Sequence, residues 1–237
     1  MLDLLYILVY NACMTNKYGS YIKSFRNERG FSQSLVAEKL GLSRASYIGM
    51  EKGERELTLS EFDKLSNILG ISMEEIETGE IPNYEKYRQM IHAFLRLNES
   101  LPKTKLAKLL YFADFAWYYS NLESMSGMPY RKIQYGPVAD SYFRLIDEMS
   151  DAGEIYVKNT NNGAMLVSET RAGAKETLSQ ISKKENSLIR DIDKKWKGKR
   201  TKEIVKFTHR QMPYIFAEDN DIVSYEVFGQ EDPDDIY

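Results

Sequence analysis

The chain has 237 residues, of which 43% are hydrophobic and 28% charged, and its formal net charge is −3. This composition excludes an intrinsically disordered chain and allows two modest globular domains with hydrophobic cores. A single cysteine, Cys13, excludes an internal disulfide framework and favours a cytoplasmic location. Because the net charge is close to zero, any attraction for nucleic acid has to come from one local face.

Residues 1–15 form an apolar leader. Its run from Leu2 to Val9 is shorter than the roughly 20 residues of a membrane helix, and Asp3 interrupts it. The positive flank of a secretory signal is missing. We therefore expect no membrane partner. Either Met14 is the natural start of translation, or the leader packs onto the body as a small strand or helix.

Residues 16–76 carry the start and stop signals of several short helices. Ser32 can cap a helix over residues 33–40, which Gly41 ends. Ser43 can cap the next helix, which Gly53 ends.

Two capping boxes follow, Thr58 with Glu61 and Ser72 with Glu75, and Gly70 closes the helix between them. Apolar residues at helical spacing predict one small shared core. They are Leu35, Val36, Leu40, Leu42, Tyr47, Met50, Leu57, Phe62, Leu65 and Leu69.

This order of parts resembles the Xre/Cro-type helix-turn-helix, a lambda-repressor-like bundle. The resemblance implies that the helix after Ser43 lies in the major groove of DNA, with its first residues at the base edges. Arg44 could pair bidentately with a guanine, a contact worth about 1 to 3 kcal/mol of discrimination. Gln33, Lys52 and Arg55 match positions that reach phosphates. The expected DNA-binding residues are Gln33, Ser43, Arg44, Ala45, Ser46, Gly49, Lys52 and Arg55.

The charge of this module is modest. Residues 17–70 hold nine Lys or Arg and seven Asp or Glu, a balance of +2. A monomer would bind nonspecific DNA poorly, so we expect a homodimer on paired half-sites. Gly49 has no side chain where many relatives place a base contact, and Ile48 is apolar. The alternatives are that this face touches protein, or that the bundle keeps a repressor's shape without reading DNA.

Gly79 and Pro82 break the helical pattern, so residues 77–83 are interpreted as a linker. From residue 84 to residue 228 apolar stripes at helical spacing predict a second, helical domain with one β-hairpin, and the fold as a whole is expected to be mainly α. The hairpin is indicated by Asn162-Gly163 between two short runs. Gly136-Pro137 is expected to begin a helix. Residues 229–237 form an acidic tail, expected to be solvated or to lie against a basic partner.

The second domain resembles the Panacea antitoxin domain, the SocA-like family. The motifs are Lys105 to Asp114, Tyr130 leading to Tyr135-Gly-Pro-Val138, Thr208-His-Arg210 with Pro213, and Ile222 to Tyr225. The resemblance implies a domain that neutralises a cognate protein toxin by binding it. A helix-turn-helix in front would let the same protein bind operator DNA and repress its own operon.

One predicted helix carries a cluster of aromatic rings that cannot all face one core: Tyr111, Phe112, Trp117, Tyr118 and Tyr119. Exposed Tyr and Trp are favoured interface anchors. The alternative is that these rings belong to the core and its rim. Asp114 is expected to be a buried hydrogen-bond partner of Tyr135 or His209. The expected toxin-binding residues are Trp117, Tyr118, Tyr130 and Tyr135.

No nucleophile with a base, phosphate-binding glycine loop or metal cluster is present, which argues against an enzyme. Cys13, His92 and His209 are too few and too scattered to hold zinc, and no cofactor is expected. Two other functions stay open. One is a phage or prophage regulator without a toxin partner, whose hairpin, with Lys158 as its only cation, would act as a wing. The other is a proteolytic adaptor that uses the acidic tail.

Overall fold

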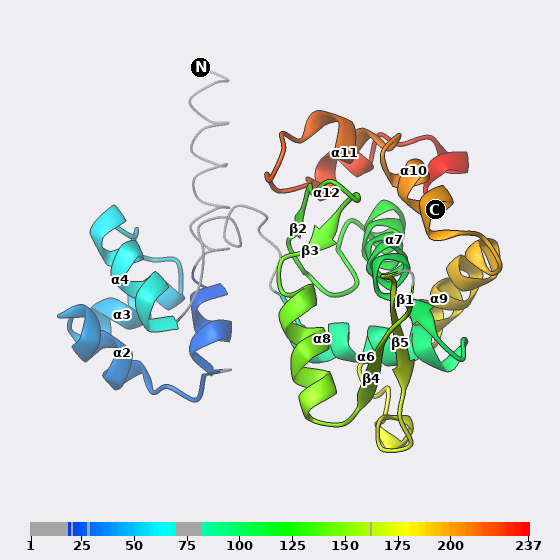
Figure 1. The fold of residues 1–237 in the computed structure, drawn as a ribbon. Coiled ribbons are helices and arrows are strands. Elements are labelled where there is room, and N and C mark those ends of the chain that lie inside the picture. The colour runs from blue at the N-terminus through cyan, green and yellow to red at the C-terminus, as the bar shows by residue number, and fades with distance from the viewer. Residues whose placement is uncertain (1–18, 20, 28, 70–81, 162) are drawn as a thin grey trace. The chain divides into compact units, whose positions relative to one another are not determined.

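The computed structural model describes residues 19, 21–27, 29–69, 82–161 and 163–237. The chain divides into two compact units, Met1–Ile81 and Pro82–Tyr237 (Figure 1). The apolar leader, the box of Ser72 with Glu75 and most of the expected linker lie outside the described residues. In the described ranges, no helix is both long and apolar enough to cross a membrane.

The first unit is built from short helices. Residues 21–27 are helical and precede α2 (Gln33–Leu40), α3 (Arg44–Glu51) and α4 (Leu59–Leu69) (Figure 1). The hydroxyl of Ser32 accepts a hydrogen bond from the backbone N–H of residue 35, and that of Ser43 accepts one from residue 46. Thr58 and Glu61 exchange the two hydrogen bonds of a capping box. The predicted caps are confirmed because each satisfies backbone donors that a helix start leaves free.

One small core joins these helices. The expected Val36, Leu40, Tyr47 and Met50 are buried, as are Leu65 and Leu69 of α4. Leu35 was expected in the core and is 37% exposed, so this expectation is wrong. Val36 and Leu40, four residues apart, already define the buried face of α2, and the preceding residue points away from it.

The second unit is organised around one central helix, α7 (Lys103–Asn121). It packs against α6 (Tyr84–Arg96), α9 (Lys183–Trp196), α10 (Thr201–Thr208) and α12 (Tyr225–Phe228) (Figure 1). Residues 105–116 of α7 are buried on every side. A helix that is buried all round is typical of the centre of a domain.

Short antiparallel strands complete the second unit. The expected hairpin is confirmed as β4 (Ile155–Asn159) and β5 (Met165–Glu169), and β1 (Leu101–Pro102) pairs with the free edge of β5. A second pair joins β2 (Tyr130–Arg131) to β3 (Val138–Ala139). The mainly α fold with one hairpin is therefore confirmed, with three small strands added.

The segment after Gly136-Pro137 is not a helix, and that expectation is wrong. Gly136 has φ of +88°, and the two residues after Pro137 form β3, while α8 (Tyr142–Asp151) begins later. Pairing with Tyr130 and Arg131 satisfies the backbone groups that a helix would otherwise have satisfied.

Three short elements complete the second unit. The 3-10 helix η1 (Gly173–Lys175) contacts α6, α11 (Met212–Phe216) contacts α12, and η2 (Pro233–Asp235) lies in the tail. The acidic tail is not wholly solvated. Glu231 is 8% exposed and accepts a hydrogen bond from the backbone of Met212, and Gln211 donates to the carbonyl oxygen of Asp235. These contacts hold the tail against the domain, because they pair polar groups at the start of α11.

Candidate functional site

The helix α3 presents the expected base-reading residues. Arg44 and Ala45 are exposed, and Ser46 and Gly49 are half-buried. Ser43 is exposed too, but its hydroxyl is engaged as the cap of α3. The start of α3 is thus accessible, as a helix that enters a groove of DNA requires.

A chain of hydrogen bonds connects Arg44 to the interior of the first unit. Arg44 donates to the side-chain oxygen of Gln33 at 3.1 Å, and the amide nitrogen of Gln33 donates to Glu51 at 2.8 Å. Arg26 donates to the same carboxylate from Nε at 2.5 Å and to the carbonyl oxygen of Phe31 at 2.9 Å. The guanidinium of Arg44 is therefore positioned by residues of three helical segments.

The carboxylate of Glu51 is almost fully covered, with 2% of its side chain exposed. Burial opposes its ionisation, but the hydrogen bonds from Arg26 and Gln33 outweigh that effect and lower the pKa of Glu51. The carboxylate stays charged and keeps Gln33 oriented. Sequence reasoning missed this ion pair, because its partners are 25 residues apart.

The three residues expected to contact phosphates differ in their exposure and in the partners they already have within the protein. Lys52 is exposed, and Glu54 is 3.9 Å from its amine. Arg55 donates to Glu61 at 2.6 Å and is half-buried. Gln33 is held between Glu51 and Arg44. Among the three, Lys52 is the freest to meet a phosphate.

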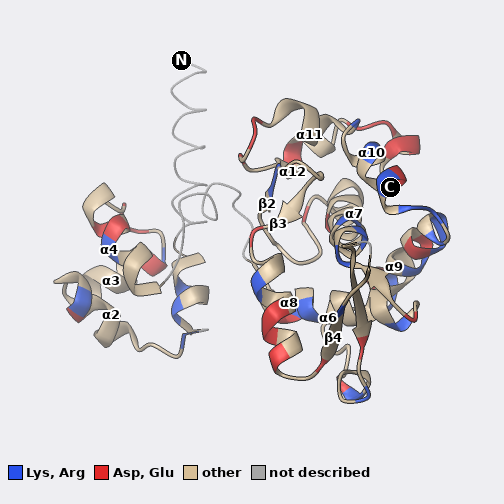
Figure 2. Ribbon diagram, viewed as in Figure 1, with Lys and Arg blue, Asp and Glu red and all other residues tan. Residues whose placement is uncertain are grey.

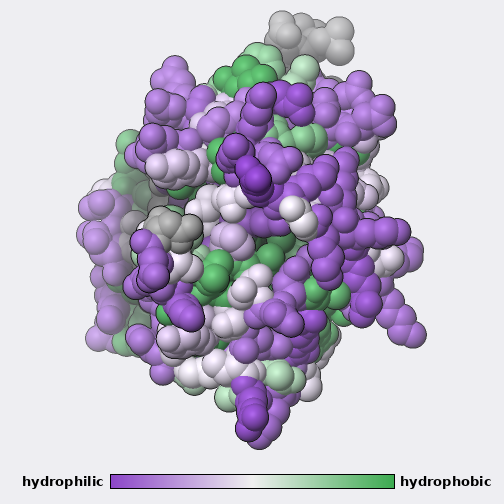
Figure 3. All heavy atoms as spheres, turned by 45° about the vertical axis from the view of Figure 1, so that its right-hand side comes forward, coloured by the Kyte–Doolittle hydropathy of each residue, from purple (hydrophilic) through white to green (hydrophobic). Residues whose placement is uncertain are grey.

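A cleft in the second unit surrounds Tyr135, whose side chain is 57% exposed. Two cavities, of about 470 and 480 Å3, adjoin there and share Thr104, Tyr135 and Thr201. On the face shown in Figure 3, hydrophobic side chains lie in a hollow that hydrophilic side chains surround. Cavities of this size, apolar with a few polar groups, are typical binding sites.

The polar groups of the cleft are basic or neutral. Lys108, from α7, is fully buried, and burial lowers its pKa well below the ordinary value. Burial, followed by the charges of Lys108 and Lys132, also lowers the pKa of His209. The ring of His209 stacks on Tyr214 with centroids 4.4 Å apart. Lys103, Lys202 and Lys206 also line the two cavities and no Asp or Glu does, so the cleft favours an anionic ligand over a cationic one.

Tyr130 was expected on the toxin-binding surface, and this expectation is wrong because its side chain has no exposed area. Its hydroxyl donates to Asp114 at 2.7 Å, and Ser126 donates to the same carboxylate from its backbone and its hydroxyl, both at 2.6 Å. Asp114 is a buried hydrogen-bond acceptor, as expected, and it accepts from Tyr130 and Ser126, where Tyr135 or His209 was expected.

Trp117 and Tyr118 are half-buried and pack against the core. They lie at the C-terminal end of α7, whereas the cleft uses Thr104 and Lys108 from its N-terminal half. Nine residues separate Lys108 from Trp117, which is roughly 13 Å along a helix axis. The four expected residues therefore do not form one surface, and Tyr135 is the one that lines the cleft.

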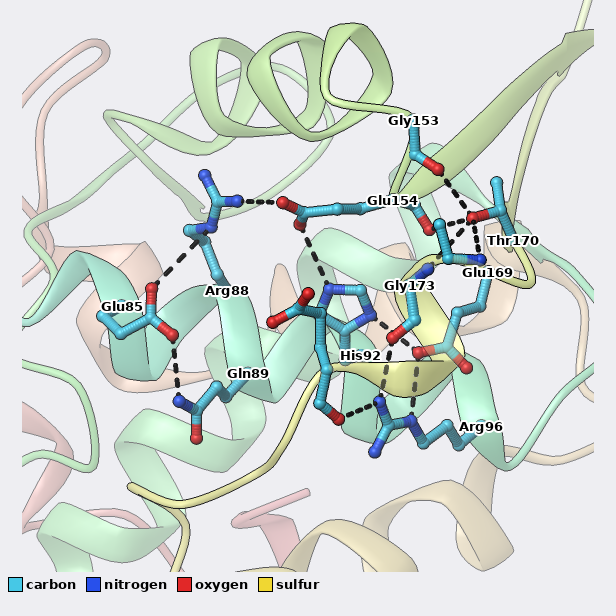
Figure 4. Close-up of polar contacts among 12 residues, drawn as sticks. Glu85, Arg88, Gln89, His92, Arg96, Gly153, Glu154, Glu169, Thr170 and Gly173 are labelled. Atoms are coloured by element: carbon cyan, nitrogen blue, oxygen red, sulfur yellow. Dashed lines mark hydrogen bonds and ion pairs between the residues drawn. The ribbon is translucent and has the colours of Figure 1, made fainter.

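A polar network that sequence reasoning missed connects α6 to the hairpin. His92, 2% exposed, faces Glu169 from Nδ1 at 2.7 Å and Glu154 from Nε2 at 3.3 Å (Figure 4). Arg88 donates to Glu154 and Arg96 to Glu169. Both ring nitrogens face carboxylates, one directly before β4 and one at the end of β5, so the network holds the hairpin on α6. The partners are 62 and 77 residues from His92, too far apart for any local signal.

Figure 2 shows Lys and Arg gathered where α9 leads into α10. Residues 183–206 contain ten Lys or Arg and four Asp or Glu. Lys202 and Lys206 line the second cavity from this basic segment. Across the described residues, no group of three His, Cys, Asp or Glu side chains could hold a metal ion.

Comparisons with known families agree with this architecture. Residues 22–76 match a helix-turn-helix family, and residues 106–214 match the family described as antitoxin SocA-like, Panacea domain. No solved structure matches the chain significantly.

Among curated proteins, the chain is 39% identical over 62 residues to the SPbeta prophage-derived HTH-type transcriptional regulator YonR of Bacillus subtilis, covering 26% of the chain and 57% of that protein. It is 32% identical over 63 residues to the HTH-type transcriptional regulator YqaE of the same organism, covering 27% and 54%. It is 26% identical over 92 residues to the cryptic phage CTXphi transcriptional repressor RstR of Vibrio cholerae, covering 39% and 80%. The chain spans little more than half the length of the first two relatives. Together, these findings show that residues 22–76 match an Xre-like helix-turn-helix family and that residues 106–214 match the SocA-like Panacea antitoxin family.

Proposed function

We propose that the protein is an antitoxin that binds a cognate protein toxin through its second unit and represses its own operon through its first unit, as a homodimer on operator DNA. The observation that carries the proposal is the presence of both matched domains in one chain. The accessible start of α3, with Arg44 held in place by Gln33, supports DNA reading. The mechanism is stoichiometric masking of the toxin, without an enzymatic step.

The toxin contact is centred on Tyr135. Its exposed ring lies between two cavities, and a large aromatic beside a pocket is a typical interface anchor. Trp117 and Tyr118 lie at the other end of α7 and would belong to the outer part of a large interface.

Expression of each open reading frame next to this protein's own gene, alone and together with the full chain, tests the proposal. One neighbour should arrest growth alone, and the full chain should restore growth and co-purify with that product. Arg44→Ala should keep this protection while it releases repression of the shared promoter. The absence of any toxic neighbour, or toxicity that the chain does not relieve, would contradict the proposal.

A second candidate is a prophage regulator without a toxin partner, which the names of the phage-derived relatives favour. It predicts specific protection of promoter DNA by the full chain with no effect on growth arrest by any neighbour. The hairpin as a DNA wing finds little support, because Lys158 is the only Lys or Arg between residues 154 and 169.

A further inference from the structure

Lys108 has an unusual environment for a lysine. Its side chain has no exposed surface, it lines the cavity of about 470 Å3, and its amine donates to the carbonyl oxygen of Pro137 at 2.7 Å. An ammonium group offers three donors, and a buried cation without a counter-ion is unfavourable. Among the described residues, Pro137 is the one hydrogen-bond acceptor of this amine, which can donate further bonds.

Lys105, one turn earlier on α7, provides the contrast. Its amine donates to the carbonyl oxygens of Trp196 and Lys199, both at 2.8 Å, and it lines neither cavity. These two bonds connect α7 to the end of α9. A buried lysine with a structural role thus looks different from Lys108 in the same helix.

Gly136 lies directly against Lys108 and Thr208, where no side chain would fit. A Cβ atom at this position would lie 3.4 Å from the Nζ of Lys108 and 2.4 Å from the hydroxyl oxygen of Thr208. The φ of Gly136, +88°, is also one that other residues rarely adopt. Any larger residue here would crowd the amine from the side of the β2–β3 connection.

The residues around the two cavities are complementary to negative charge. Lys103 and Lys108 line the first cavity, Lys202 and Lys206 line the second, and no Asp or Glu lines either one. The amine of Lys103 lies 3.7 Å from the carboxylate of Asp147, whereas within the described part of the chain Lys202 and Lys206 form no ion pair. Apolar walls complete the cleft: Ala107, Ile133, Val138 and Tyr142.

We propose that this cleft binds an acidic segment of a protein partner, in which one Asp or Glu side chain reaches Lys108 while a neighbouring apolar side chain fills the cavity. The other three lining lysines, Lys103, Lys202 and Lys206, favour a segment with several carboxylates over a single chain terminus. The inference rests on the proposed function only in taking the partner to be a protein. In the toxin complex, Lys108 would be the positioning contact for the entering carboxylate.

Three peptides titrated into the full chain and followed by NMR test the inference. They are acetyl-Glu-Phe-Glu-amide, its neutral counterpart acetyl-Gln-Phe-Gln-amide, and acetyl-Gln-Phe-Gln with a free carboxyl terminus. The Glu peptide should bind at least tenfold more tightly than the neutral one and shift the signals of Ala107, Lys108 and Gly136. Equal affinities, shifts elsewhere, or tightest binding by the terminal acid would overturn the inference.

Two matched variants locate the effect. Lys108→Met should reduce the ratio of acidic to neutral affinity to less than threefold, whereas Lys105→Met should lower stability and leave the ratio unchanged. A ratio that survives Lys108→Met overturns the inference. If Lys108→Met does not fold, the signals that shift in the wild-type protein still decide where the acid binds.

The outcome is separable from that of the proposed function. Loss of toxin binding in Tyr135→Ala, combined with no preference for the Glu peptide, would contradict this inference and leave the antitoxin function standing. A clear preference for the Glu peptide in a chain that relieves no toxin would support this inference and contradict the antitoxin function.

Discussion

Replacing Arg26 with methionine should destabilise the first unit selectively. The variant removes the ion partner of Glu51, whose side chain is 2% exposed, and the hydrogen bond to the carbonyl oxygen of Phe31. Breaking a buried ion pair from one side costs about 3 to 5 kcal/mol, since the remaining charge is left without compensation. A unit of this size lies near the lower end of the usual stability of roughly 5 to 15 kcal/mol, so most of its stability should be lost.

Amide hydrogen exchange in α3 measures this effect, and exchange there should accelerate roughly a hundredfold or more. Both tryptophans, Trp117 and Trp196, belong to the second unit, so their fluorescence transition serves as an internal control and should not change. Arg26→Met combined with Glu51→Met should recover much of the loss, because no buried charge remains. Unchanged exchange in α3, or a double variant as unstable as the single one, would refute the reasoning.

The same ion pair predicts a dependence on pH. The pKa of Glu51 is lowered in the folded unit, so its contribution to stability is complete above the ordinary glutamate value of 4.5 and is lost as the pH falls further. Exchange in α3 should therefore accelerate at acid pH in the wild-type chain beyond the intrinsic effect of pH. The Arg26→Met, Glu51→Met double variant should lack this additional dependence.

Further predictions concern DNA, the core and the cleft. Arg44→Ala should lower discrimination at one base pair in each half-site in footprinting, while Lys52→Ala should weaken all sequences alike and reduce the salt slope by about one. Tyr130→Phe removes a donor to buried Asp114 and should cost about 1 to 3 kcal/mol in the tryptophan-detected unfolding transition, with toxin binding unchanged. Tyr135→Ala should leave the tryptophan-detected unfolding transition unchanged, whereas the affinity for the toxin should fall roughly thirtyfold or more in a binding titration. Toxin binding unaffected by Tyr135→Ala would move the interface elsewhere.

The sequence by itself determined the local features. Ser32, Ser43 and the pair of Thr58 with Glu61 cap helices as expected, and the two strands of the expected hairpin pair with each other. These signals depend on side chains that bond to backbone groups a few residues away, or on a turn that one glycine permits. Such interactions are the same in any fold that contains the segment.

Tertiary structure alone decided which residues are accessible and what they contact. Tyr130 and Tyr135 looked alike in the sequence, yet one is buried on Asp114 and the other is exposed at the cleft. The residues after Gly136-Pro137 form strand β3 because they pair with β2. His92 contacts two glutamates that are 62 and 77 residues away in the sequence. The amine of Lys108 donates to the carbonyl oxygen of Pro137, which is 29 residues away. Each outcome depends on which distant segments pack together, and a local pattern does not contain that information.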